Sequence, residues 1–140
     1  MLALLFAWAS ATHAGEICPA DQAQRIHIGA QTFNVDVAAS LTDREHGLSD
    51  RAALTAESGM WFVFPSPDWH GFWMHGMNFP IDLVWVSPAR QVLGAITLQP
   101  CAGEPCRIHK PPSPVAYVLE INAGAFAGKT GDNVTWSCTP

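Results

Sequence analysis

Two acidic residues stand inside apolar runs of the sequence, where a charge is expensive to bury. Asp82 lies within the run 81–86, and Glu120 lies within the run 115–121. In an extended strand, Asp82 shares a face with Val84, and Glu120 shares a face with Val118. A covered carboxylate is costly unless it is paired or hydrogen-bonded, so we expect Arg44 to form a buried ion pair with one of the two acids. The alternative hypothesis is that one of these carboxyl groups is the acid or base of an enzyme.

A second group combines two histidines and two methionines: His70, Met74, His75 and Met77. Imidazole and thioether groups are the copper ligands of exported proteins, so a copper-handling function is one hypothesis. If residues 71–77 form a strand, His75 and Met77 share one face and His70 and Met74 share the other. At most one pair could then hold one ion without a bulge. The alternative is that the methionines fill gaps in an aromatic core.

Tryptophan is concentrated in the same part of the chain. Trp61, Trp69, Trp73 and Trp85 fall between residues 61 and 85. A tryptophan N–H needs a partner when it is buried, so some of these rings are expected to line an open groove. Trp69, in a loop, is expected to be exposed. The leading functional prediction is a binding module for a small molecule or an extended peptide near Trp73, with Arg44, Asp82 and Glu120 as its polar groups.

The elements that position these residues are short and mostly extended. Alternation predicts one hairpin over 25–38 and a second over 81–98, and apolar runs predict strands at 60–64 and 115–121. The pattern from Thr42 to Glu45 fits a capping box, and Gly47 is placed to end that helical turn. Pro65 and Pro67 are expected to leave the sheet. Together these features predict a mainly β, single-domain antiparallel β-sandwich or barrel with one or two short helical turns.

The beginning of the chain and the cysteines indicate export. Residues 1–14 are apolar and then small, as in a signal peptide, and are too short to span a bilayer, which takes about 20 apolar residues. Residues 15–24 would then be an N-terminal segment and 25–138 the single β domain. Four cysteines in an oxidising compartment favour disulfides, and of the three possible pairings we favour Cys101–Cys106 with Cys18–Cys138. The predicted location is periplasmic or secreted.

The charge of the chain argues against two classes of partner. The net charge is −5, and the seven Lys and Arg residues form no basic run. Nucleic acid and anionic membrane surfaces are therefore not expected as partners, because both require clustered cations. The sequence also lacks the local signatures of a serine hydrolase elbow, an HExxH zinc site, a phosphate-binding loop and a dinucleotide-binding loop.

Five short motifs occur in a fixed order along the chain. They occupy residues 44–48, 59–64, 72–83, 117–124 and 131–132. In this order they resemble the motifs of the bacterial and archaeal "domain of unknown function 192" family, over roughly residues 26–136. The resemblance implies a compact, mainly β single domain that is often exported in bacteria, and it implies no known activity. Many members carry Lys-Asn-Thr where this chain has His75, Gly76 and Met77.

Overall fold

The computed structural model describes residues 17–140, so the expected signal peptide at 1–14 lies outside the described residues. These residues form seven strands and one short helix. The elements are β1 (Ala23–Ile28), β2 (Gln31–Ala38), α1 (Leu41–His46), β3 (Ser58–Asp68), β4 (Ile81–Val86), β5 (Val92–Leu98), β6 (Val115–Asn122) and β7 (Val134–Thr139).

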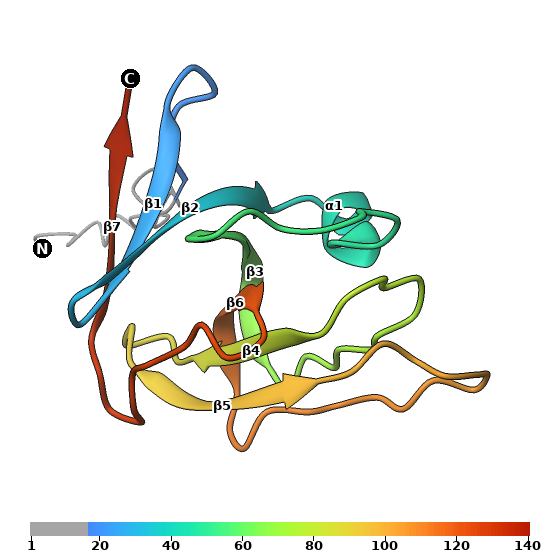
Figure 1. Cartoon of the computed structure of the whole chain (residues 1–140). Coiled ribbons are helices and arrows are strands. Elements are labelled where there is room, and N and C mark those ends of the chain that lie inside the picture. The colour runs from blue at the N-terminus through green and yellow to red at the C-terminus, as the bar shows by residue number, and fades with distance from the viewer. Residues whose placement is uncertain (1–16) are drawn as a thin grey trace, which may run out of the picture.

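All seven strands belong to one sheet, in the order β5-β4-β6-β3-β2-β1-β7. The neighbouring strands are antiparallel except β2 and β3, which are parallel. A parallel pair needs a long crossover, and the connection from Ala38 to Ser58, which contains α1, provides it. The sheet is strongly curved, so β1 and β7 stand upright in Figure 1 while β4 and β5 lie across the view. The prediction of a mainly β fold is confirmed, with a mixed rather than purely antiparallel sheet.

The sheet has a core on each of its two faces. Trp61, Val84 and Leu119 belong to one core. Phe62, Leu83 and Val118, which follow or precede them by one residue, belong to the other. Strands β4 and β6 are therefore apolar on both faces, because both faces are covered.

The second core is covered by loops and by the region of α1. Leu48, Met74 and Phe72 pack there against Phe62 and Trp85. Ser40, rather than Thr42, is the N-cap of α1, because its hydroxyl accepts from the backbone N–H of Asp43. Gly47 ends the helix with a positive φ, as its position in the sequence predicted.

Both favoured disulfides are confirmed. Cys18 is bonded to Cys138, which joins the two ends of the domain, and Cys101 is bonded to Cys106 within one loop. Among residues 17–140, no helix is long and apolar enough to cross a membrane.

One local assumption does not hold, and one local prediction is wrong. Residues 71–77 form no regular strand: the backbone makes one bridge, Phe72 to His109, and then turns at Gly76. Strand β3 continues through Pro65 and Pro67 to Asp68. The ladder with β6 is interrupted between Val63 and Asp68, so neither proline has to supply a ladder N–H.

A candidate binding groove beside helix α1

A groove of about 840 Å³ opens over the second core. Helix α1 contributes Leu41 and Arg44, the loop after β3 contributes Phe72 and Trp73, and the segment before β6 contributes Ile108. The volume falls within the range of about 300–1,000 Å³ that is typical of small-molecule sites. The groove thus joins three segments that are far apart in the sequence.

Aromatic rings support one another along the wall of the groove. The ring centroids of Phe62 and Phe72 lie 5.0 Å apart, edge to face. The His70 ring stacks on Phe64 at 3.7 Å, and Phe72 contacts Trp85 at 5.6 Å in the core below. These contacts hold the apolar surface in place, because edge-to-face and stacked pairs each contribute roughly 0.5–1.5 kcal/mol beyond burial.

Large apolar side chains are exposed around this groove. Leu41, Trp73 and Ile108 are 65%, 53% and 59% exposed, and all three line it. They make up half of the six exposed large hydrophobic residues among residues 17–140. Trp69 is also 53% exposed, as expected, but it does not line the groove. Exposed apolar side chains that converge on one hollow are typical of a binding site rather than of scattered surface residues.

Glu120 brings a carboxyl group to the apolar floor of the groove. It lies on the interior strand β6, opposite Leu83 of β4 and Met60 of β3, and is 6% exposed. Burial raises its pKa to about 8. Among residues 17–140, no hydrogen bond or ion pair is found for its side chain. A buried carboxyl group without a partner is unfavourable for folding, so its position next to a hollow calls for a functional explanation.

The predicted ion pair of Arg44 with Asp82 or Glu120 is wrong. Arg44 donates from Nη1 to the backbone oxygens of Ala39 and Val63, the latter at 3.1 Å, and its guanidinium lies 5.4 Å from the centroid of the Phe64 ring. The Arg44 guanidinium is thus bound to backbone carbonyl groups rather than to a carboxylate. Arg44 therefore ties α1 to the sheet and leaves Glu120 unpaired, although both residues line the groove.

Asp82 lies on the opposite face of the sheet. It faces Ile121 in the register of β4 and β6, whereas Glu120 faces Leu83. The Thr97 hydroxyl donates to Asp82 Oδ1 at 2.7 Å, and the backbone N–H of Phe126 donates to Oδ2 at 3.0 Å. Two donors satisfy this carboxylate without an arginine, so Asp82 joins β5 and the segment after β6 instead of serving the groove.

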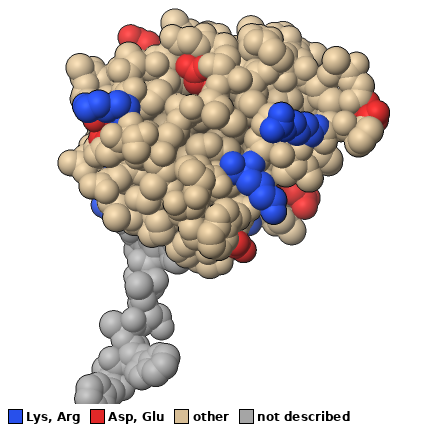
Figure 2. All heavy atoms as spheres, turned by 90° about the horizontal axis from the view of Figure 1, so that it is seen from below, with Lys and Arg blue, Asp and Glu red and all other residues tan. Residues whose placement is uncertain are grey.

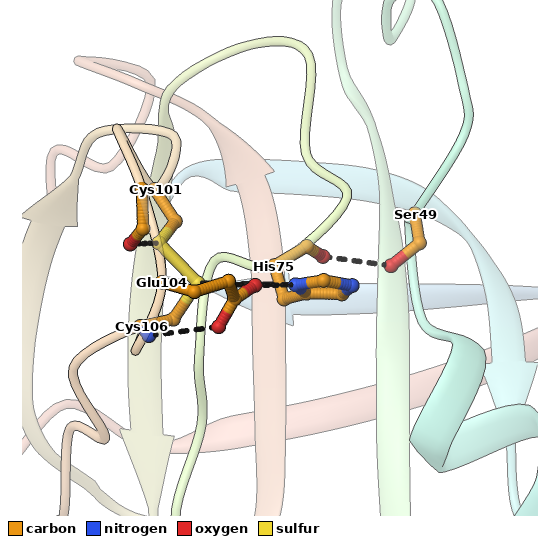
Figure 3. Close-up of polar contacts among 6 residues, drawn as sticks. Ser49, His75, Cys101, Glu104 and Cys106 are labelled. Atoms are coloured by element: carbon orange, nitrogen blue, oxygen red, sulfur yellow. Dashed lines mark hydrogen bonds and ion pairs between the residues drawn. A yellow bond between two sulfur atoms is a disulfide. The ribbon is translucent and has the colours of Figure 1, made fainter.

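The four candidate copper ligands lie in three different places in the structure. His70 and Met77 line the groove, while Met74 is buried in the second core at 4% exposure. His75 turns away toward the loop after β5, where its Nδ1 lies 2.5 Å from Glu104 Oε1 (Figure 3). Because residues 71–77 are not a strand, the alternation assumed for these four side chains does not apply. Copper binding stays a prediction.

Several groove residues were not predicted from the sequence. Leu41 begins a helix whose six residues include no buried one, and Ile108 belongs to a loop rich in proline. A solvent-facing leucine in such a helix is the one signal that could have indicated Leu41. No signal in the sequence indicated Ile108, because its approach to Gly71 depends on the long-range bridge between Phe72 and His109.

Comparisons with known proteins identify a family and similar solved structures, but they give no activity for this chain. A model of the family DUF192, described as "Uncharacterized ACR", matches residues 24–136. A crystal structure of a candidate transcription regulator from Sinorhizobium meliloti 1021 is similar with a TM-score of 0.72 and 25% identity, over 82% of this chain and 92% of that one. A protein of unknown function from Novosphingobium aromaticivorans DSM 12444 is similar with a TM-score of 0.70 and 27% identity, over 89% and 97% of the two chains. No curated protein matched significantly.

Proposed function

Because this chain belongs to the DUF192 family, whose description states no activity, we propose a function from its own groove. The protein binds a small molecule that has an apolar body and a head group able to donate a hydrogen bond. The observation that carries this proposal is the buried carboxyl group of Glu120, for which no partner is found among residues 17–140, in a groove lined by aromatic and aliphatic side chains with Arg44, Glu45 and Lys110 among them. Apolar walls combined with a few convergent polar groups are how small-molecule sites combine affinity with orientation.

The protonation state of Glu120 determines which head groups of a ligand can bind next to it. With its pKa raised to about 8, the carboxyl group is mostly protonated at neutral pH. A ligand hydroxyl can then both donate to it and accept from it. An amine cation can also enter, but it favours the ionised carboxylate, and its binding must release a proton. A ligand carboxylate is disfavoured on the floor, because a second acidic group would meet Glu120 without water.

The charge distribution supports a small-molecule ligand over nucleic acid. The chain has a net charge of −5, and the face drawn in Figure 2 is mostly uncharged, with few Lys and Arg side chains and no continuous basic band. Binding to a phosphate backbone requires several clustered cations. The description of the Sinorhizobium relative as a regulator therefore does not extend to a DNA-binding role in this proposal.

Calorimetric titration with two matched probes, 2-naphthylmethylamine and 2-naphthylmethanol, tests the proposal. Both should bind through the aromatic ring, and the amine alone should release close to one proton near pH 7, which is measured as a heat that depends on the ionisation enthalpy of the buffer. The Glu120→Gln variant should still bind the alcohol but release no proton with the amine. Glu45→Gln, which alters an exposed residue of the same groove, is the control. Equal proton release by wild type and Glu120→Gln would contradict the proposal.

A second candidate function uses the same carboxyl group as a catalytic acid or base. A group whose pKa lies near neutrality exchanges protons most effectively there, and Glu120 has this property next to an open groove. Copper handling has weaker support, because only His70 and Met77 of the expected ligands reach the groove. We place the protein in the periplasm or outside the cell, a location with which its two disulfides agree.

A further inference from the structure

A second cluster of chemically active side chains lies apart from the groove lining. His75 Nδ1 is 2.5 Å from Glu104 Oε1, and Cys106 Sγ is 3.9 Å from His75 Nδ1 and 3.6 Å from Glu104 Oε1. Within the described part of the chain, this is the one group of three or more His, Cys, Asp or Glu residues whose ligand atoms lie within 4.8 Å of one another. Figure 3 shows the imidazole and the carboxylate meeting beside the Cys101–Cys106 disulfide.

Hydrogen bonds fix the turn that carries His75 and join it to the cysteine loop. The Ser49 hydroxyl donates to the carbonyl oxygen of His75 at 3.1 Å, and the N–H of Asp50 donates to that of Gly76 at 3.0 Å. On the other segment, the N–H of Cys101 donates to the carbonyl oxygen of Met74 at 3.2 Å. The histidine turn and the cysteine loop are therefore positioned by contacts that do not depend on the disulfide, and they stay adjacent if that bond opens.

The three ligand types fit zinc. Imidazole nitrogen, carboxylate oxygen and thiolate sulfur are the zinc ligands of proteins, and three of them leave one tetrahedral position open for water. Bonds of about 2.0–2.3 Å place tetrahedral ligand atoms roughly 3.3–3.8 Å apart. The two sulfur distances already lie near this range. Only His75 and Glu104 must separate, and both side chains are more than half exposed, which leaves them room to move.

The Cys101–Cys106 disulfide prevents Cys106 from acting as the third zinc ligand. While Cys106 is bonded to Cys101, its sulfur is not a thiolate and binds zinc poorly. Cys101 lies outside the cluster of ligand atoms and packs against the second core. Opening the bond therefore frees two thiols, of which the Cys106 thiol faces a histidine and a carboxylate.

We propose that reduction of the Cys101–Cys106 disulfide creates a zinc site formed by His75, Glu104 and Cys106. A dithiol protein reductant supplies the two electrons and two protons: its two thiols become a disulfide, and the bond between Cys101 and Cys106 becomes two thiols. Zinc then displaces the proton of the Cys106 thiol and binds the neutral imidazole at Nδ1. The oxidised protein lacks this site, so metal binding reports the redox state of the loop.

Two single substitutions distinguish metal binding at this site from metal binding by any free thiol. Cys101→Ser frees the Cys106 thiol without any reductant and leaves Cys18–Cys138 intact, whereas Cys106→Ser loses the same disulfide but frees Cys101 instead. Co²⁺ is the probe, because thiolate ligation gives it a charge-transfer absorption in the near ultraviolet, and Zn²⁺ should displace it. Cys101→Ser is expected to bind one equivalent with this absorption, while oxidised wild type and Cys106→Ser show none.

Adding His75→Ala to Cys101→Ser should weaken Co²⁺ binding on the order of tenfold or more, as should adding Glu104→Gln. The proposal is overturned if Cys106→Ser gives the same absorption, or if His75→Ala leaves the affinity of Cys101→Ser unchanged. If Cys101→Ser does not fold, the wild type reduced with a phosphine is compared with equally reduced Cys106→Ser. Equal zinc affinity of those two proteins would also overturn it.

Discussion

At about pH 9, the Glu120→Gln variant is expected to be more stable than the wild type, by at most roughly 5 kcal/mol, whereas at about pH 4 the two proteins should unfold at similar denaturant concentrations. Glutamine keeps the shape of the protonated side chain and removes its ability to ionise. Most single substitutions of buried residues destabilise a protein, so a gain of this kind would be unusual.

The direction follows from where the carboxyl group ionises in each state. In the unfolded chain Glu120 loses its proton near its ordinary pKa of 4.5, but burial raises the pKa to about 8 in the folded protein. Between these two values the unfolded state binds fewer protons, so the free energy of unfolding falls as the pH rises, by up to about 1.4 kcal/mol per unit. Below the lower value the wild type has its full stability, and above the higher value the loss is complete.

Urea unfolding of wild type and variant at several pH values between these limits measures the effect. Glu45→Gln is the matched control, because Glu45 is exposed on helix α1 at the wall of the same groove and should leave the pH dependence unchanged. A wild-type stability that does not fall relative to Glu120→Gln between about pH 5 and pH 8 would show that the carboxyl group is not buried without a partner.

Replacing both Cys18 and Cys138 by serine is expected to lower the free energy of unfolding more than replacing both Cys101 and Cys106. The first disulfide closes a loop with a sequence separation of 120 residues, and the second a loop of 5. Chain entropy in the unfolded state gives about 5 kcal/mol for the long loop and about 2 kcal/mol for the short one. The Cys18–Cys138 bond also anchors β7, an edge strand that pairs with β1 alone among the strands of residues 17–140.

Denaturant unfolding of the two double variants, each compared with the oxidised wild type, tests this difference. Each variant replaces two sulfur atoms by hydroxyl oxygens, so each is the control for the other. An equal loss in the two variants, or a larger loss for the short loop, would contradict the entropic account and indicate that residues 101–106 stabilise the domain through local contacts.

Alternation along single strands predicted the two cores well, because the side-chain period of a strand is fixed by its backbone. It placed Val84 with Asp82 and Val118 with Glu120, and these two valines lie in opposite cores, although Val115 and Ala116 at the start of β6 do not follow the alternation. What alternation cannot supply is the register between strands. The pairing of Leu83 with Glu120 places the two acids on opposite faces, and that pairing depends on contacts between residues nearly forty positions apart.

The partners of the charged residues were harder to predict for a related reason. Asp82 and Arg44 are both satisfied by backbone or hydroxyl groups rather than by opposite charges. Every residue offers a backbone donor or acceptor, so the sequence contains no particular signal for such a bond. Likewise His75 meets Glu104, which is 29 residues away, because the backbone turns at Gly76 instead of continuing as the strand that was considered for residues 71–77.

The most direct test of the binding groove compares two tryptophans that differ in place but not in exposure. Trp73 and Trp69 are both 53% exposed, and Trp73 alone lines the groove. In calorimetric titrations with 2-naphthylmethanol, Trp73→Ala is expected to weaken binding by about tenfold or more, while Trp69→Ala binds like the wild type. If the two substitutions weaken binding equally, or if Trp73→Ala has no effect, the ligand does not occupy this groove.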